Sequence, residues 1–232
     1  MFKLSFYIVR NKINSHKKFK ALIIRKIKEL CSTDIMRRNC KYYKVSYNVP
    51  YLKLSKYDGI FEMWFDNFES ISTIKKYFDF KYLSENCTDM LNLNECNYII
   101  SEEYPSIWGN EMAYSQKRIK FTTLLIRNNK MNFDEFKNYH KNHHIQLFSS
   151  IPVTRNNIKK YVVSHQMEKA KRGKEYDGIV EFWFNNLFSL IMVFINPKYL
   201  LKVRPDERKF LDLNECDFII SREYTDFIRV EV

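Results

Sequence analysis

Glycine and proline are scarce in this sequence, with four and five residues among 232. It contains no glycine-rich loop of the kind that holds nucleotide phosphates and no recognised nucleic-acid motif, which argues against functions built on such motifs. The five cysteines form no C-x-x-C pair and their number is odd. This usage favours buried, reduced thiols and a cytoplasmic setting.

Long hydrophobic runs are lacking as well. The longest one, around Leu187 to Ile195, is too short to span a bilayer. Near the N-terminus, Lys3 and Arg10 interrupt a short apolar stretch, so a secretory signal is not expected. Hydrophobic residues still make up 45% of the chain and aromatic residues 16%, which is ample for a packed core and argues against disorder.

Charge is distributed unevenly along the chain. Residues 1–60 contain 15 Lys or Arg and 3 Asp or Glu, whereas residues 61–232 contain 24 of each, so the net charge of +12 lies in the first part. Its densest segment, residues 16–28, reads as a basic helix with Phe19, Ile23 and Ile27 on one face. We interpret it as a solvated helix packed on a sheet. Peripheral contact with an anionic membrane surface or with nucleic acid is the alternative, and no specific nucleic-acid partner is predicted.

One nine-residue string occurs twice. Tyr176–Phe184 repeats Tyr57–Phe65 with only two differences, and two of the four glycines lie in these copies. The segment 91–104 likewise returns as 211–224. The chain is therefore read as a domain-sized tandem duplication, with repeats at 1–104 and 119–232 and a polar connector at 105–118.

Each repeat follows the order β-α-β-β-α-β. The predicted strands are Phe2–Val9, Tyr42–Tyr47, Gly59–Phe65, Asn97–Glu103, Ile119–Ile126, Lys159–His165, Gly178–Phe184 and Asp217–Glu223, and the predicted helices are Ser15–Leu30, Asn67–Phe78, Phe133–Phe148 and Leu187–Ile195. Thr225–Val232 could add a short extra strand. This order is the ferredoxin-like unit. Because such a sheet has one open face, we expect an α+β fold in which two repeats pack as an intramolecular pseudo-dimeric barrel.

The second repeat resembles an EthD domain of the dimeric α+β barrel superfamily. The likeness rests on Leu124–Arg127 with Phe136–His144, on Tyr161–His165, and on Tyr176–Phe184 with Phe210–Asp212. His144 falls on the family's histidine, while His140 stands where an aromatic Trp is usual. The first repeat resembles a degenerate copy.

That resemblance implies a small-molecule function. Family members are implicated in polyketide tailoring such as decarboxylation or dehydration, and the wider superfamily includes haem enzymes, monooxygenases and polyketide cyclases. Fold likeness alone does not settle chemistry.

A stripe of histidines lies on the apolar side of the predicted helix. Phe133, Phe136, His140, His143, His144 and Leu147 share one face at the helical period. A buried imidazole needs a hydrogen-bond partner, so the stripe indicates either satisfied packing residues or a pocket between helix and sheet. In the second reading His144 is a general acid or base, because the histidine pKa lies near neutrality.

Further candidates come from the strands. Asp177, Glu181 and Trp183 alternate on one side of a strand, Tyr161 and His165 on one side of another, and Arg127 ends a third. If these sides face the helix, Glu181 orients a histidine and Arg127 holds a carboxylate or enolate. The predicted catalytic residues are His144, His140, His165 and Glu181, and the predicted substrate-binding residues are Arg127, Tyr139, His143, Tyr161, Asp177 and Trp183. Glu62 occupies the same position in the first repeat as Glu181 does in the second. A structural role for both glutamates is therefore an equal alternative to a catalytic one.

The sequence thus favours a lyase or tailoring enzyme for an aromatic or polyketide-like substrate, with no bound cofactor. One alternative is a non-catalytic protein that binds a small ligand or an anionic partner. Another is a haem or metal-binding oxidoreductase, although the i, i+4 pair His140 and His144 lacks the glutamate of H-E-x-x-H. The sequence also leaves open whether the chain forms a homo-oligomer. In the first repeat, Ile23 and Ile27 occupy the positions of the two histidines, so we expect that copy of the site to be filled and one ligand to bind per chain.

Overall fold

A computed structural model describes residues 1–49, 54–77, 87, 89–109, 118–168 and 173–224 of the chain. The first half of the chain contains the strands and helices of the predicted order and one further short helix. They are β1 (Phe2–Ile8), α1 (His16–Cys31), α2 (Asp34–Asn39), β2 (Tyr42–Asn48), β3 (Gly59–Phe65), α3 (Phe68–Tyr77) and β4 (Asn97–Glu103). Helix α1 begins as predicted, because the Ser15 side chain accepts a hydrogen bond from the Lys18 amide.

The second half repeats the same strand order with more helical segments. They are β5 (Ile119–Leu125), α5 (Phe133–Tyr139), η1 (His140–His144), α6 (Ile145–Ser149), α7 (Pro152–Asn157), β6 (Ile158–Glu168), β7 (Gly178–Phe184), α8 (Leu187–Phe194), η2 (Tyr199–Val203), α9 (Arg204–Phe210) and β8 (Asp217–Tyr224). The segments η1 and η2 are π-helical turns. Segments α5, η1 and α6 follow one another directly and together form the predicted helix Phe133–Phe148.

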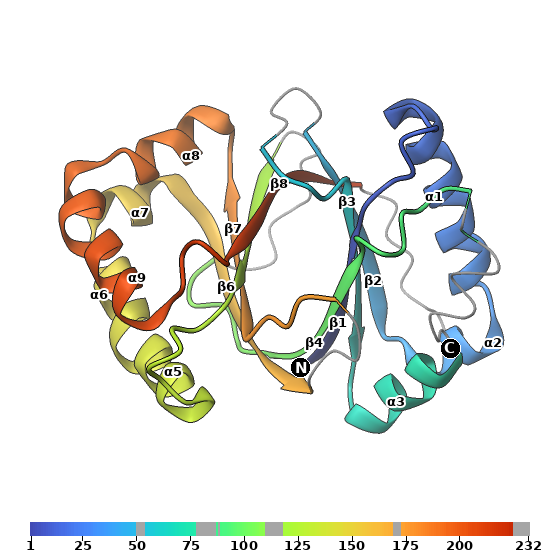
Figure 1. The fold of residues 1–232 in the computed structure, drawn as a ribbon, viewed down its shortest axis with the longest axis horizontal. Coiled ribbons are helices and arrows are strands. Elements are labelled where there is room, and N and C mark those ends of the chain that lie inside the picture. The colour runs from blue at the N-terminus through green and yellow to red at the C-terminus, as the bar shows by residue number, and fades with distance from the viewer. Residues whose placement is uncertain (50–53, 78–86, 88, 110–117, 169–172, 225–232) are drawn as a thin grey trace.

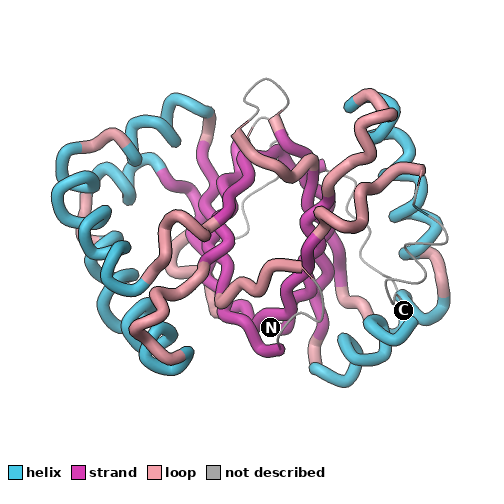
Figure 2. The backbone as a smooth tube through the Cα atoms, in the orientation of Figure 1, coloured by secondary structure: helices cyan, strands magenta, loops and turns pink. Residues whose placement is uncertain are grey.

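The strands form a closed antiparallel barrel, with the helices on its outside (Figures 1 and 2). Among the described residues the strand order is β1-β3-β2-β8-β5-β7-β6-β4. The strands of each half are therefore contiguous, and the pairs β2–β8 and β4–β6 close the barrel. A closed barrel leaves no strand edge open to another chain.

The two repeated glycines stand where neighbouring backbone comes close. A Cβ added at Gly59 would lie 2.9 Å from the Ser46 carbonyl oxygen, and one at Gly178 would lie 2.8 Å from that of Ser164. Both glycines begin a strand, β3 and β7, at equivalent register positions. Their recurrence in the sequence thus has a steric cause.

Strand alternation sorts side chains between the lumen and the helices. Lys3 on β1 contacts Glu181 on β7, and these strands are not neighbours, so the contact crosses the barrel lumen. Residues of the opposite parity, such as Phe121 and Phe182, pack instead against the helical layer. The lumen of the barrel therefore holds this ion cluster and, farther along the same strand faces, a smaller apolar cluster that includes Ile60, Leu124 and Ile179. The two larger apolar cores lie outside the lumen, beneath the helices of each half.

The sequence predicted the strands better than the helices. Gly59–Phe65, Asn97–Glu103 and Gly178–Phe184 match the observed strands, and β6 extends three residues beyond the predicted end at His165. The helical segments α2, α7, η2 and α9 were not predicted. The expected strand at Thr225–Val232 and residues 110–117 of the connector lie outside the described residues. In the part of the chain described here, no helix is long and apolar enough to cross a membrane.

Candidate functional site

A cavity of about 300 Å³ lies between the outer face of the second-half strands and the helices that cover it. Its volume is at the lower end of the range for small-molecule sites, about 300–1,000 Å³. Most of its wall is aromatic or aliphatic, contributed by Phe121, Leu125, Phe148, Tyr161, Val180, Phe182, Phe194, Tyr199, Phe210, Leu211, Leu213 and Phe218. The polar side chains of the wall include His140, His144, Arg204 and Glu207.

Two histidines reach the cavity from η1. The helix that carries them begins at a capping box, in which the Asn132 side chain accepts from the Glu135 amide and the Glu135 carboxylate accepts from the Asn132 amide. At η1 the helix widens, and the Ile145 amide donates to the His140 carbonyl in an i→i+5 bond. The imidazoles of His140 and His144 are both buried, with ring centroids 5.7 Å apart. Such π-turns occur frequently at functional sites.

His144 is held by a buried carboxylate. Its Nδ1 lies 2.9 Å from Oδ2 of Asp206, whose side chain is 2% exposed. The Tyr139 hydroxyl donates to the other oxygen, Oδ1, at 2.5 Å. His143, which is mostly exposed, places its Nε2 3.3 Å from the same oxygen. Tyr139 and His143 thus support Asp206 from outside the cavity.

This network keeps the Asp206 carboxylate ionised. Burial alone would raise the pKa of Asp206, but the hydrogen bonds from His144 and Tyr139 outweigh it and hold the pKa well below the usual range. An ionised carboxylate only accepts, so Nδ1 of His144 must carry the proton that joins them. In the neutral imidazole Nε2 is then unprotonated, and no group within the described residues is hydrogen-bonded to it. Nε2 is therefore the nitrogen of His144 that has no partner within the described residues.

His140 belongs to a second, neutral chain of hydrogen bonds. Its Nδ1 lies 3.0 Å from Nε2 of His165, and Nδ1 of His165 lies 3.3 Å from the Tyr104 hydroxyl. Burial and the neighbouring His165 lower the pKa of His140 well below its ordinary value. Burial and two nearby lysines lower the pKa of His165 to about 3. Both imidazoles are consequently uncharged at neutral pH, so His140 offers the cavity a neutral polar edge beside His144.

A third polar group lies at the start of α9. Glu207 accepts a hydrogen bond from the Tyr199 hydroxyl at 2.8 Å and one from Nη1 of Arg204 at 2.9 Å. The hydrogen bonds leave part of the half-exposed Arg204 guanidinium free to contact an anion. The cavity thus combines a base, a neutral imidazole and a cation around an aromatic surface.

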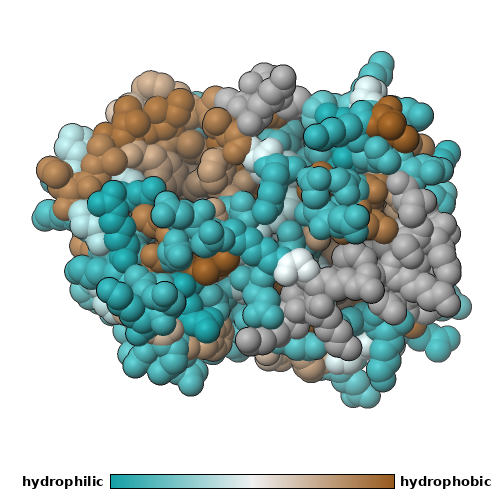
Figure 3. Space-filling view, viewed as in Figure 1, coloured by the Kyte–Doolittle hydropathy of each residue, from teal (hydrophilic) through white to brown (hydrophobic). Residues whose placement is uncertain are grey.

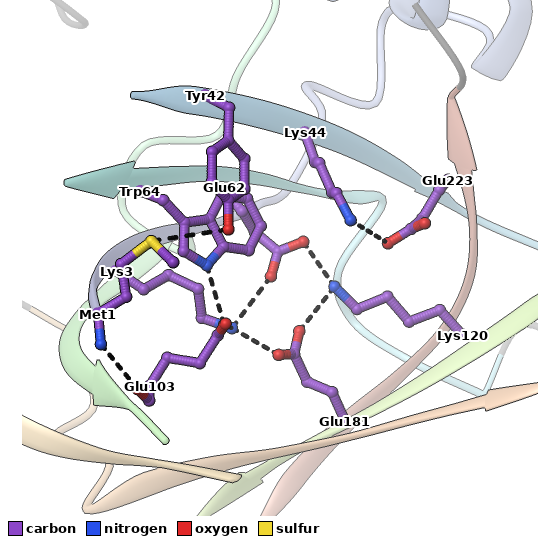
Figure 4. A network of polar contacts seen from close by, with 10 residues as sticks. All are labelled: Met1, Lys3, Tyr42, Lys44, Glu62, Trp64, Glu103, Lys120, Glu181 and Glu223. Atoms are coloured by element: carbon purple, nitrogen blue, oxygen red, sulfur yellow. Dashed lines mark hydrogen bonds and ion pairs between the residues drawn. The ribbon is translucent and has the colours of Figure 1, made fainter. Parts of the chain in front are cut away.

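Glu181 and Trp183 do not lie with the histidines. Figure 4 shows Glu181 in the barrel lumen, where it forms ion pairs with Lys3 at 2.5 Å and Lys120 at 2.6 Å. The Trp183 ring packs against the Lys120 ammonium, 5.1 Å from its centroid. The expectation that Glu181 orients a histidine is therefore corrected: its strand parity turns it inward, on the face opposite to Phe182.

The two luminal glutamates, Glu62 and Glu181, differ in their pKa. Lys120 also binds Glu62 at 2.5 Å, and Lys3 approaches Glu62 at 3.4 Å. Burial raises the pKa of Glu62 to about 7, whereas Lys120 and Lys3 overcome the same burial and depress the pKa of Glu181. The neighbouring Glu181 carboxylate also raises the pKa of Glu62, so Glu62 is the one that protonates first.

Arg127 and Asp177 pair with each other beside the cavity wall rather than on it. Asp177 accepts from both the backbone amide and the guanidinium of Arg127. The Arg127 Nε also donates to the Met131 carbonyl at 3.2 Å. These contacts brace the end of β5 against the start of β7, so the Arg127 guanidinium is engaged with Asp177 and the Met131 carbonyl.

The corresponding space in the first half is smaller. A void of about 60 Å³ lies over the sheet, with Ile23 and Ile27 where the second half has His140 and His144. Its wall is largely apolar and includes Phe6, Phe61, Met63 and Leu30. Among the described residues, the first-half void therefore has about one fifth of the volume of the second-half cavity.

Three wall residues, Tyr199, Arg204 and Glu207, were missed from the sequence, as was Asp206, the partner of His144. A signal existed, because Pro205-Asp206-Glu207 reads as a helix start with acidic residues in its first turn. It lies 62 residues after His144, so only the fold brings the two together. Among the described residues, no group of three or more His, Cys, Asp or Glu side chains is arranged to hold a metal ion.

Comparison with known proteins agrees with the second-half likeness. The EthD domain family matches residues 128–214, the segment that carries η1, η2 and α9. This confirms the predicted resemblance for that segment. A comparison with curated proteins gave no match.

Solved structures show the same barrel. An anthrone oxidase-like protein matches with a TM-score of 0.71 and 9% identity, over 100% of this chain and 93% of that chain. A putative monooxygenase from Fusobacterium nucleatum matches with a TM-score of 0.61 and 7% identity, over 98% of this chain and 94% of that chain. A mutant chlorite dismutase from Candidatus Nitrospira defluvii matches with a TM-score of 0.57 and 10% identity, over 96% of this chain and 91% of that chain. The chain thus shares the barrel fold of these structures. Within it, residues 128–214 are similar to the EthD domain family.

Proposed function

We propose that the second-half cavity is the active site of a small-molecule enzyme, a lyase or tailoring enzyme of the decarboxylase, dehydratase or cyclase type. The observation that carries this proposal is the buried His144–Asp206 pair, of which His144 lines the cavity. A histidine with one nitrogen tied to a carboxylate and the other unprotonated is the arrangement of a general base. The proposal includes no bound cofactor.

The wall of the cavity supports an aromatic or polyketide-like substrate. Phe148 and Phe182 stack with ring centroids 5.1 Å apart, and Tyr161 lies 4.7 Å from Phe182. Flat aromatic surfaces of this kind favour planar rings. Arg204 supplies a cation for a carboxylate or enolate, the groups that such substrates carry.

The proposed chemistry is a proton transfer. His144 Nε2 takes a proton from the substrate, from a carbon next to a carbonyl group or from a hydroxyl group. The imidazolium that forms is stabilised by the ionised Asp206 carboxylate. The same proton then returns to the leaving hydroxyl in a dehydration, or to carbon after loss of carbon dioxide. Arg204 binds the negative charge that develops in between.

We also propose that the barrel is the single-chain counterpart of a dimer. Its halves, 1–104 and 119–232, have the strand orders β4-β1-β3-β2 and β8-β5-β7-β6, which are the same order in equivalent strands. In this reading the second half keeps the site, and the first half, with Ile23 and Ile27, provides support.

Turnover of a panel of aromatic and polyketide acids tests the function. Wild type should convert at least one acid, and His144→Ala should lose at least about 100-fold in kcat. Ile27→Ala, the same kind of truncation at the equivalent position of the first half, should keep kcat. Equal turnover by wild type and His144→Ala would remove His144 from the mechanism. Binding without turnover would favour a non-catalytic ligand-binding protein.

A further inference from the structure

Large apolar side chains are exposed on the outer surface of α8 and η2. Leu201 is 77% exposed and Phe188 is 69% exposed, and Ile191, Ile195 and Leu200 are exposed beside them. Figure 3 shows the hydrophobic surface that gathers over the α8 side of the molecule. We call these five residues the α8–η2 patch. Contiguous exposed apolar surface of this kind marks an interaction site.

Positive charge accompanies the patch. Lys198 and Lys202 are exposed and flank Leu200 and Leu201 in the sequence. The segment 185–204 contains Lys198, Lys202 and Arg204 and no acidic residue. Apolar side chains between cations match the boundary between the acyl chains and the headgroups of a bilayer that contains anionic lipid.

We propose that the α8–η2 patch docks the protein on the surface of an anionic lipid bilayer. The five apolar side chains enter the headgroup boundary, and Lys198 and Lys202 contact lipid phosphates. A second copy of the chain fits less well. A symmetric contact through this patch would bring the lysines of both copies together, and segment 185–204 offers no carboxylate to neutralise them.

The same segment separates the bilayer from the cavity. Phe194 and Tyr199 line the cavity from the inner side of α8 and η2, and their rings contact each other at 5.1 Å. Phe218, partly exposed, also belongs to the cavity wall. Docking through the patch would therefore hold the cavity next to the lipid, so that an apolar substrate dissolved there reaches it directly. Only this last statement rests on the proposed function.

Vesicle co-sedimentation of the full chain tests the proposal. Wild type should bind vesicles of phosphatidylcholine with phosphatidylglycerol and bind phosphatidylcholine alone much more weakly. Lys198→Gln with Lys202→Gln should lower the partition coefficient about 30-fold, the equivalent of about 1 kcal/mol per cation. Phe188→Ser with Leu201→Ser should lower it at least about 10-fold. Circular dichroism should show unchanged folding, since all four side chains are exposed.

The basic helix α1 provides the matched control. Lys17 and Lys18 are exposed on α1, in the other half of the chain, so Lys17→Gln with Lys18→Gln removes the same charge outside the patch. This variant should keep binding within about threefold. An equal or larger loss than with Lys198 and Lys202 would assign membrane contact to α1 and overturn the proposal.

Two other outcomes would also overturn it. One is no preference of wild type for anionic vesicles. The other is a stable dimer in analytical ultracentrifugation that Leu201→Ser dissociates, which would make the patch a contact between copies. His144→Ala should bind vesicles like wild type, so a failure of the proposed chemistry and a failure of docking are separable.

Discussion

Nδ1 of His144 lies 2.9 Å from Oδ2 of Asp206, although 62 residues separate them in the chain. The contact joins the π-turn η1 to the first turn of α9 within the helical layer of the second half. It leaves Nε2 as the nitrogen of this cavity-lining residue that has no protein partner within the described residues. The proposed chemistry therefore depends on a residue outside the histidine stripe.

Asp206→Asn should lower kcat without preventing ligand binding. The amide can still accept from Nδ1, but it lacks the charge that stabilises the imidazolium, so we expect a loss of about 100-fold or more. The KM should change by much less. Glu207→Gln is the matched control, because Glu207 pairs with Tyr199 and Arg204 rather than with His144. A kcat for Asp206→Asn equal to that of wild type would contradict the assignment.

Stability should respond to pH through the buried imidazoles. The folded-state pKa of His165 is about 3, below its ordinary value near 6.5, so between these pH values the unfolded chain binds a proton that the folded chain does not. His165 therefore contributes stability that is present above pH 6.5 and lost as pH falls. At pH 5 the loss is roughly 2 kcal/mol in the free energy of unfolding, at about 1.4 kcal/mol for each pKa unit.

Urea unfolding at pH 7 and pH 5 measures this effect. Glu62 has the opposite effect on stability. Its folded-state pKa is raised to about 7, so as pH falls from 7 to 5 the folded chain binds a proton that the unfolded chain does not, which stabilises the fold. Comparison with His165→Phe removes that background. The variant should lose less stability than wild type on going from pH 7 to pH 5. The same loss in both proteins would show that His165 is not kept neutral by burial.

The luminal ion cluster should be far more sensitive than a surface pair. Lys120→Met leaves Glu62 and Glu181 short of a cation in a buried setting, so we expect a loss of roughly 3–5 kcal/mol in unfolding free energy. Lys41→Met breaks a pair with Asp66 of similar length, 2.7 Å, at the exposed surface and should cost less than about 1 kcal/mol. Equal losses in the two variants would mean that the lumen is well hydrated.

The repeated strands were predictable because their signals are local. Alternation, aromatic and β-branched residues and the two glycines define β3 and β7 within nine residues. The histidine stripe was also visible, since a helical period places His140 and His144 on one face. Their burial at the cavity agrees with that interpretation.

The remainder of the site depends on the closed barrel. Strand parity says that Glu181 and Phe182 face opposite sides, but not which side is the lumen, and the ion pairs with Lys3 and Lys120 decide it. Asp206 lies in a short helix whose sequence gives only a start signal. No local pattern connects it to η1, because the contact forms only when both segments pack on the same sheet.

Calorimetric titration with an aromatic acid that the protein turns over tests the central claim most directly. That claim is one working site per chain, at the His144–Asp206 pair, because the equivalent space in the first half is about 60 Å³ against about 300 Å³. We expect a stoichiometry near one, and no measurable binding to His144→Trp, whose larger side chain fills the cavity. A stoichiometry near two, or full binding by His144→Trp, would contradict the account.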